Sequence, residues 1–461
     1  MSTLEHAGPV VRPADGPAAR PGKPRVAAVD VVRGLLLVVI VVSGSLLEPP
    51  AWFDHAPWAG VHLLDLVFPS FVLLMGVGLG FACARGVQLS RLPRRVLVLL
   101  AAGLAYNAAV QWARLGTVDL EQLRWTGVLQ LFALVTLVIS LVHLVVRGWV
   151  AWTAAALALA AGHTWLLARW AATCPGGELT PACNPSLGLD PALLPAGHLY
   201  WQMDAGHDPE GLVAVLGACV TAAAGVAAAH ALRGRTAAPA GGPVGTGAAG
   251  PVGRGLAAVG LAGPGVLPAA ARLVVVAAVL AGAGRVASLW VPPMKRLWTA
   301  PFGLSVAALV VVLVAVVHLL VDAPWVQRRR APASDVLAPE APAHEVLAAG
   351  RAEARRREGG TGPGARTAAT GAAAAVRALR EPFVALGRNS LLVYVASEVL
   401  AAFLLLRPLR DDPSQAPSHA QDLAQHLAWL GGPQVGLSVA LLAGWWVLAA
   451  VLHRRRWYLR A

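Results

Sequence analysis

The chain has 461 residues, of which 57% are hydrophobic and 13% are charged, and its mean hydropathy is +0.62. An average soluble domain has roughly 45–50% apolar and about 25% charged residues, so this composition excludes an ordinary soluble protein and indicates a polytopic membrane protein. The formal net charge of +13 is typical of basic cytoplasmic loops, and we predict no nucleic-acid partner.

The N-terminal segment, residues 1–25, is rich in proline and arginine and is predicted to be a disordered basic tail. The first apolar run, about 29–47, carries Asp30 and Arg33 one helical turn apart, so the two charges can neutralise each other at the membrane edge. This run ends in Glu48 and two prolines and not at a small-residue cleavage site. It is therefore predicted to be a retained helix and not a signal peptide.

Further apolar segments along the chain are about 18 to 24 residues long, enough to cross roughly 30 Å of hydrocarbon at 1.5 Å per residue. They lie near 64–84, 94–112, 127–146, 149–170, 211–232, 268–290, 299–322, 383–406 and 435–453. The sequence therefore predicts an all-α fold, a polytopic membrane helical bundle of about ten transmembrane helices.

Basic residues fall mainly in alternate loops, which sets the expected orientation. The basic set comprises Arg20, Lys23, Arg25, Arg85, Arg91, Arg94, Arg95, Arg147, Arg233, Arg235, the segment 323–380 and Arg454, Arg455 and Arg456. The opposite loops, 48–63, 113–126, 171–210, 291–298 and 407–434, hold less arginine and lysine. We expect both termini to be cytoplasmic and the loop 48–63 to face outward, in a multi-pass protein surrounded by the lipids of a bacterial plasma membrane.

The domain organisation follows from composition. The expected parts are the tail 1–25, about six helices with an outer loop at 171–210 in 26–235, a Gly/Ala/Pro linker at 236–267, two helices in 268–322, a disordered cytoplasmic insertion at 323–380, and the last two helices with a basic tail in 381–461. Neither linker can bury enough apolar surface to fold alone. We favour disordered linkers over a binding arm.

Two cysteines, Cys174 and Cys183, flank a short Gly/Pro turn in the outer loop 171–210. An oxidising outer compartment would permit a disulfide between them. Two unpaired thiols are the alternative, because closeness in sequence does not fix the Cα separation that a disulfide needs.

A polar stretch, residues 55–69, joins the first two apolar segments and is the candidate active-site loop. His55 follows Asp54 and precedes Asp65 by ten residues. A histidine with a pKa near 6.5 is largely neutral at pH 7, so His55 could act as a general base or as an acyl-accepting nucleophile. A structural hydrogen-bonding role is the alternative on spacing alone.

Later helices carry polar residues that could face the same site. Gln130 lies just inside one helix, and Lys295 precedes another. Ser390, Tyr394 and Glu398 are four residues apart, so they share one helical face that should point into the bundle. The alternative is that these groups only bond neighbouring helices.

Several motifs, in a fixed order, resemble those of the heparan-alpha-glucosaminide N-acetyltransferase family of polytopic acyltransferases. They are Arg25 to Gly34, His55-Ala56-Pro57-Trp58, Asp65 to Phe71, Gly127 to Gln130, Asp208 to Leu212, Lys295-x-Leu297-Trp298-Thr299 and Gly387 to Val395. The resemblance implies an all-helical bundle with a buried site. It also implies transfer of an acetyl group from acetyl-CoA to an amino sugar across a membrane, with His55 as the catalytic residue.

Roles for other residues are hypotheses based on their polarity and on their expected depth in the bundle. Asp54 or Asp65 would hold the tautomer of His55, and Asn389 or Tyr394 would donate to the thioester oxyanion. The expected sets are His55, Asp65, Asn389 and Tyr394 for catalysis, Arg33, Gln130, Lys295 and Ser390 for acetyl-CoA, and Trp58, Asp208, Glu210 and Trp298 for the acceptor. No metal is expected. Direct transfer and an acyl-histidine intermediate both stay open.

The histidine motif departs from the family pattern. Ala59 stands where an asparagine is usual, His62 replaces a threonine, and Ser43 or Gly44 replaces an upstream asparagine. The acceptor therefore stays open between an amino sugar, an envelope glycan and another small amine or hydroxyl compound. A transporter and an inactive acyltransferase-derived scaffold are the alternative functions, although no pair of Gly/Pro-broken segments recurs in two halves as many transporters require. A homodimer is also left open.

Overall fold

The computed structural model describes residues 26–233, 266–322, 363–406 and 418–459, and every regular element within these ranges is helical. The all-α prediction is confirmed. The α-helices are α1 Ala27–Ser43, α2 Val67–Ala82, α3 Leu92–Leu115, α4 Val128–Val142, α5 Trp149–Ala171, α6 Pro185–Leu193, α7 Leu212–Arg233, α9 Val266–Ala287, α10 Ala300–Val321, α13 Pro363–Arg388, α14 Ser390–Leu406, α15 His419–His426 and α16 Pro433–Arg454. Short 3-10 helices are η1 Leu64–Leu66, η2 Cys83–Arg85, η3 Pro175–Gly177, η4 Ala196–His198, η5 Tyr200–Met203 and η6 Ala428–Leu430.

Within the described ranges, 7 helical segments are long and apolar enough to cross a membrane, or 8 if a bent helix pair forms one span. The 7 are Leu64–Ala82, Leu92–Leu115, Trp149–Ala171, Leu212–Arg233, Val266–Ala287, Ala300–Val321 and Pro433–Arg454. The multi-pass membrane character is confirmed. The count of ten and the orientation of the termini stay predictions, because α1 has 17 residues and α4 has 15, and 15 residues span only about 22 Å.

Helix α7 forms the centre of the bundle, with 89% of its most apolar window buried. Its sequence is rich in alanine and glycine, which lets neighbouring helices approach closely. A Cβ atom at Gly76 of α2 would overlap the carbonyl oxygen of Ala222, and one at Gly225 would overlap that of Leu73. The small residues therefore fix the α2–α7 contact, and α2 carries one wall of the candidate site.

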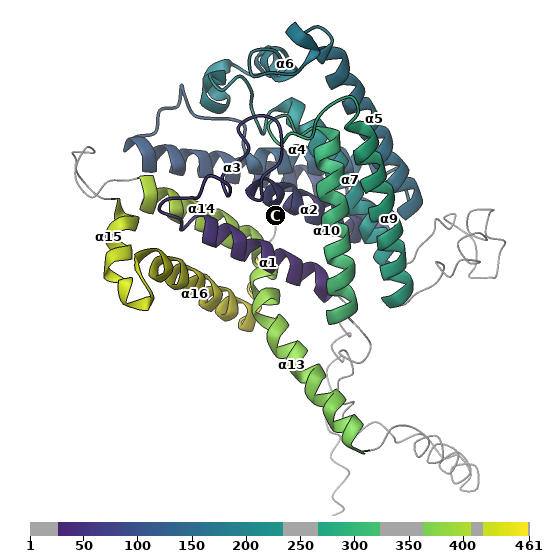
Figure 1. Ribbon diagram of the computed structural model, residues 1–461, viewed down its shortest axis with the longest axis vertical. Helices are drawn as coiled ribbons and strands as arrows, with labels where there is room; N and C mark the ends of the chain where they lie inside the picture. The colour runs from purple at the N-terminus through teal and green to yellow at the C-terminus, as the bar shows by residue number, and fades with distance from the viewer. Residues whose placement is uncertain (1–25, 234–265, 323–362, 407–417, 460–461) are drawn as a thin grey trace, which may run out of the picture.

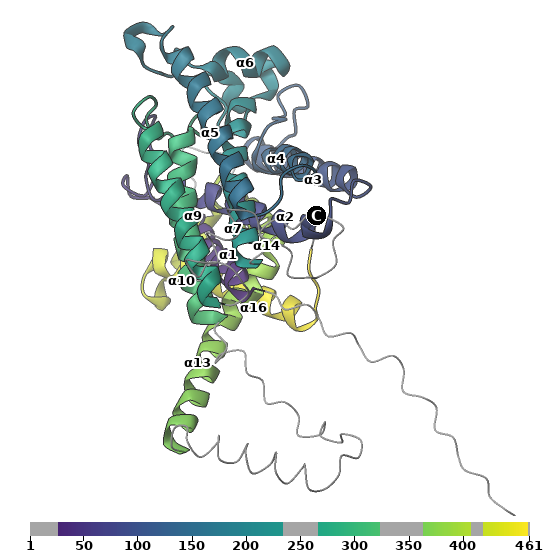
Figure 2. The ribbon, with the colours of Figure 1, turned by 90° about the vertical axis from the view of Figure 1, so that its right-hand side faces the viewer.

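The bundle has two distinct ends. Figures 1 and 2 show α6 and the long loop around it at one end, while α13 extends from the opposite end. At the α13 end, the backbone N–H of Ala27 donates to Asp322 across 2.9 Å, so the first turn of α1 meets the C-terminus of α10. The loop with His55 follows the other end of α1. We refer to these as the α13 end and the α6 end.

The segment between α10 and α14 differs from the sequence prediction in two ways. Residues 363–380, predicted as part of a disordered insertion, form the first part of α13, since the run Ala372–Ala375 has a high helix propensity. The predicted single helix 383–406 is two helices that meet at an angle of 73° around Asn389. The predicted tail 1–25, nearly all of the linker 236–267, and residues 323–362 of the insertion lie outside the described residues.

Candidate active site

The side chain of His55 is oriented by Asp65. His55 lies in the loop between α1 and η1, and its Nδ1 is 2.6 Å from Oδ1 of Asp65. Asp65 is fully buried, and its Oδ2 accepts from the backbone N–H groups of Ala56 at 3.2 Å and His62 at 2.8 Å. An ionised carboxylate only accepts hydrogen bonds, so the Nδ1 of His55 carries the proton. The Nε2 therefore presents its lone pair.

Lys295 contacts the other side of the imidazole. Its Nζ lies 3.0 Å from Nε2 of His55, 3.2 Å from Nδ1, and 4.0 Å from Oδ1 of Asp65. The sequence grouped Lys295 with the acetyl-CoA residues, whereas the structure brings it to His55. Burial lowers the pKa of Lys295, although the negative charges of Glu210 and Asp65 oppose this shift. The ammonium group can donate to the Nε2 lone pair.

Backbone and side-chain contacts hold the Lys295 loop against the His55 loop. The N–H of Gly60 donates to the carbonyl of Pro293 at 3.2 Å, and Nε of Arg296 donates to the carbonyl of Ala56 at 3.1 Å. Gly60 has φ +95°, a conformation that suits glycine. These contacts join segments about 240 residues apart, so the His55–Asp65–Lys295 cluster depends on the folded bundle.

A cavity of about 1760 Å³ connects this cluster to the α13 end of the bundle. Its lining includes His55, Glu210 and Lys295 at the α6 end and Arg33, Arg233 and Asp322 at the α13 end. Glu210 precedes α7 and Arg233 ends it; the 22 residues of this helix are about 33 Å long. The cavity therefore extends through the bundle, and its volume exceeds the roughly 300–1,000 Å³ of pockets for drug-sized ligands.

Hydroxyl and carboxyl groups line the middle of the cavity. Tyr106 comes from α3, while Ser390, Tyr394 and Glu398 come from successive turns of α14. The shared helical face predicted for the α14 residues therefore faces the cavity. Tyr106 was missed, because a tyrosine within an apolar segment gives no sign of which neighbour it will face.

Guanidinium groups gather at the α13 end of the cavity. Arg33, Arg95 and Arg388 line it together with Asp30. Asp30 lies 3.9 Å from Arg33 and 3.3 Å from Nε of Arg388. The Nε of Arg95 is buried and has no hydrogen-bond partner among the residues that the structure describes. With Arg233, four arginines and two carboxylates, Asp30 and Asp322, line this end, so positive charge exceeds negative charge there, although the sequence singled out only Arg33 for the site.

Glu210 is held at the cavity wall by Arg124. The Nη2 of Arg124 donates to Oε2 of Glu210 at 2.7 Å and to Oδ1 of Asp208 at 2.6 Å. Burial on its own would lower the pKa of Arg124, but Glu210 and Asp208 outweigh it, so the pKa is raised. Asp208 also accepts from the N–H of Tyr200 at 2.9 Å and does not line the cavity. Asp208 therefore organises the loop 171–210, while Glu210 reaches the cavity.

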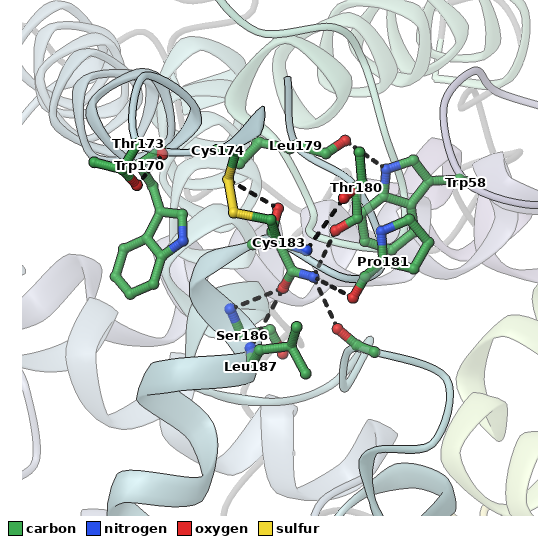
Figure 3. Close-up of a disulfide and its surroundings, with 12 residues drawn as sticks. Trp58, Trp170, Thr173, Cys174, Leu179, Thr180, Pro181, Cys183, Ser186 and Leu187 are labelled. Atoms are coloured by element: carbon green, nitrogen blue, oxygen red, sulfur yellow. Dashed lines mark hydrogen bonds between the residues drawn. A yellow bond between two sulfur atoms is a disulfide. The ribbon is translucent and has the colours of Figure 1, made fainter. Parts of the chain in front are cut away.

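A disulfide closes part of the loop 171–210 beside the His55 stretch. Cys174 and Cys183 are bonded, with Cα atoms 5.8 Å apart. The indole N–H of Trp58 donates to the carbonyl of Leu179, at 2.8 Å, inside the loop that the disulfide closes (Figure 3). Trp58 is three residues from His55, so this bond ties the active-site stretch to the disulfide loop. Trp58 itself does not line the cavity.

Three other predicted site residues lie in the packed interior and not on the cavity wall. Gln130 packs against Gly103 and Gly127 between α3 and α4. Trp298 is fully buried, and its indole N–H donates to Oγ1 of Thr221 at 3.1 Å. Asn389 is fully buried at the α13–α14 bend, where its Nδ2 donates to the carbonyl of Ala385 at 3.2 Å. Among the described residues, the buried Nε2 of Gln130 and Oδ1 of Asn389 have no hydrogen-bond partner.

The described residues contain no group of three or more His, Cys, Asp or Glu side chains that could hold a metal ion. The cluster at the α6 end can instead perform acid–base or nucleophilic chemistry, because it combines an oriented imidazole, a buried carboxylate and an ammonium group.

Residues 25–173 match the family model described as heparan-alpha-glucosaminide N-acetyltransferase, catalytic. The chain is 25% identical over 260 residues to the heparan-alpha-glucosaminide N-acetyltransferase of Homo sapiens and 24% identical over 260 residues to that of Mus musculus. Each alignment covers 45% of this chain and 39% of the relative, so the chain matches about two fifths of the length of these curated relatives. The resemblance stated from the motifs is confirmed.

Proposed function

We propose, on the premise that this chain belongs to a heparan-alpha-glucosaminide N-acetyltransferase-like family, that it is a multi-pass acetyltransferase of a bacterial plasma membrane. It takes an acetyl group from acetyl-CoA at the α13 end and passes it to an amine or hydroxyl group of a sugar or other glycan acceptor at the α6 end. The observation that carries this proposal is the single cavity between the guanidinium groups of one end and His55 at the other. Membrane lipids are its expected surroundings, and a homodimer stays a prediction.

The donor's phosphate groups suit the α13 end. Arg33, Arg95 and Arg388 offer guanidinium groups, which bind phosphate oxygens through charge-assisted, often paired hydrogen bonds. With the nucleotide part bound there, the narrow thioester arm would extend along the cavity past Ser390 and Tyr394 toward His55. The large volume of the cavity, about 1760 Å³, is sufficient for a long and flexible co-substrate such as acetyl-CoA.

His55 would perform the transfer through its Nε2. The 2.6 Å bond from Nδ1 to Asp65 holds the neutral tautomer with the Nε2 lone pair available and stabilises the imidazolium that forms. In direct transfer, Nε2 removes the proton of the acceptor amine or hydroxyl as that group attacks the thioester. In stepwise transfer, Nε2 attacks first and carries the acetyl group as an acyl-imidazole. Both routes release CoA and need the same tautomer.

Lys295 would stabilise the negative charge that develops on the thioester oxygen. When the carbonyl carbon sits beside Nε2, its oxygen comes within reach of the ammonium group, which lies 3.0 Å from the same nitrogen. A preorganised cationic donor in a buried site lowers the barrier by a few kcal/mol, typically about 3. Glu210 lines the same end of the cavity, and its carboxylate would accept hydrogen bonds from the acceptor.

The test is CoA release by the purified full chain from acetyl-CoA, with and without a panel of amino sugars and envelope glycans. His55→Ala is the active-site variant. His426→Ala is the matched control, because His426 is exposed in α15 and does not line the cavity. We expect acceptor-dependent release that His55→Ala abolishes and His426→Ala leaves unchanged. If the wild type binds acetyl-CoA but releases CoA no faster than His55→Ala with every acceptor, the scaffold or transporter alternative replaces this function.

A further inference from the structure

The chain contains two lysines, Lys23 and Lys295, and one of them occupies a position that an acceptor must take. A general base has to lie within about 2.6–3.2 Å of the group that it deprotonates. The Nζ of Lys295 is 3.0 Å from Nε2 of His55. A primary amine of the protein itself therefore stands where the nitrogen of an acceptor would stand.

We propose that Lys295 is a self-acetylation site, at which the enzyme modifies itself when acetyl-CoA is bound and no acceptor is present. The proposal rests on the proposed function, because the acetyl group must first reach His55. Lys295 lines the cavity along which the thioester arm would arrive, so the donor can meet Nζ without any opening of the fold.

The reaction balances without a further reagent. The ammonium group of Lys295 first releases a proton to water, and the neutral Nζ then attacks the thioester carbonyl carbon. The new C–N bond forms while the C–S bond breaks, and His55 Nε2 takes the second proton from nitrogen. This proton passes to the departing sulfur, so the products are acetyl-lysine and CoA in its thiol form.

The surroundings of Lys295 explain why this reaction competes only when the acceptor is missing. Asp65 lies 4.0 Å away, and the negative charges of Asp65 and Glu210 favour the unreactive ammonium form. Burial acts in the opposite direction and increases the neutral fraction. An acceptor bound beside His55 would occupy the Nε2 lone pair, so Nζ would stay protonated beside the thioester oxygen and would be protected from acetylation.

Acetylation would also switch the site off. Acetyl-lysine has lost its positive charge and two of its three N–H donors. It could no longer stabilise the oxyanion, and its acetyl group would occupy the space beside His55. Excess donor without acceptor should therefore cause a progressive loss of activity that acceptor prevents, which would limit futile use of acetyl-CoA.

The experiment incubates the purified full chain with acetyl-CoA, with and without glucosamine, and measures acetyl occupancy at both lysines by peptide mass spectrometry. Lys23 is the internal control for uncatalysed acetylation. We expect at least roughly tenfold higher occupancy at Lys295 than at Lys23, because a positioned amine gains a large effective concentration. Glucosamine should suppress the modification. Loss of the base in His55→Ala should reduce the Lys295 rate by about 100-fold, and Asp65→Asn should reduce it as well.

Three results would overturn the inference. They are equal occupancy at both lysines, an unchanged Lys295 rate in His55→Ala and Asp65→Asn, and absence of acetyl-Lys295. In the last case, His55-dependent acetylation of glucosamine would show that the proposed function stands and that only self-acetylation is refuted. Absence of acetyl-Lys295, together with no His55-dependent CoA release for any acceptor of the panel, would refute the two together. Lys295→Arg is the control for assigning the modified residue. The intact mass of this variant should lack the acetyl group that the wild type gains at Lys295.

Discussion

The substitution Asp65→Asn isolates the step in which the protein fixes the tautomer of His55. The carboxylate of Asp65 accepts a hydrogen bond from Nδ1 of His55 at 2.6 Å and also accepts from the backbone N–H groups of Ala56 and His62. The asparagine carbonyl can keep backbone N–H bonds, so the loop should stay folded. Its amide NH₂ would then face Nδ1 and donate to it, which moves the imidazole proton to Nε2. The catalytic lone pair is lost.

The size of the effect has two contributions. A hydrogen bond to a charged group contributes about 1.5–3 kcal/mol, which corresponds to roughly 10- to 150-fold in rate. Reversal of the tautomer adds to this, and the same substitution in a serine protease triad lowers kcat by about 10⁴-fold. We therefore expect kcat for CoA release to fall by roughly 10²- to 10⁴-fold, with little change in the affinity for acetyl-CoA.

Asp54→Asn is the matched control in the same assay. Asp54 is exposed, and among the described residues its carboxylate accepts from the backbone N–H of His55, at 2.7 Å, and not from the imidazole, so it does not set the tautomer. We expect less than about a threefold change in kcat, because a surface substitution of this kind costs within roughly 0.5 kcal/mol. If folded Asp65→Asn keeps more than a tenth of wild-type kcat, or if Asp54→Asn is the more damaging variant, the account of His55 orientation is wrong.

Three further predictions concern the donor end and the outer loop. Arg95→Gln should weaken CoA binding by roughly tenfold or more, since a charge-assisted hydrogen bond is lost. Isothermal titration calorimetry measures the affinity for CoA, with Arg94→Gln as the control because Arg94 is exposed. Equal affinity of the two variants would contradict the prediction. Cys183→Ser should lower the free energy of unfolding by about 3 kcal/mol, because the disulfide closes a short loop. Denaturant unfolding of the wild type and the variant measures this difference, and coincident unfolding curves would contradict the prediction. Burial raises the pKa of Asp190 to about 6, so the folded state holds one more proton than the unfolded state between about pH 4 and 6. The free energy of unfolding should therefore fall by about 3 kcal/mol as pH rises through this range. Asp190→Asn should flatten the pH dependence of thermal unfolding, and an unchanged slope would contradict this prediction.

Hydropathy was sufficient to predict the helices of the membrane domain. Each of the ten apolar segments overlaps a helix of the structure, because burial in lipid forces the backbone to satisfy its own hydrogen bonds. Hydropathy could not predict α6 and α15, which have only 9 and 8 residues, nor the bend at Asn389. These features depend on local capping and on contacts with neighbouring helices.

The candidate site was only partly predictable. His55 and Asp65 are ten residues apart, and their sequence already suggested a pair. The contact of Lys295 with His55 joins loops about 240 residues apart, and sequence spacing carries no information about such a contact. The same reason hid Tyr106 and Arg95, whose helices do not reveal which face meets the cavity. Trp298 is a motif residue that is buried and does not line the cavity, so a motif alone does not identify which side chains meet the cavity.

Sided vesicles test most directly the claim that one cavity links a donor at one membrane face to His55 at the other. The full chain is reconstituted with glucosamine only in the lumen and acetyl-CoA only outside, and N-acetylglucosamine is measured in the lumen. The account predicts luminal product with the wild type and with His426→Ala, and none with His55→Ala. Product that forms only when both substrates share one compartment would contradict it.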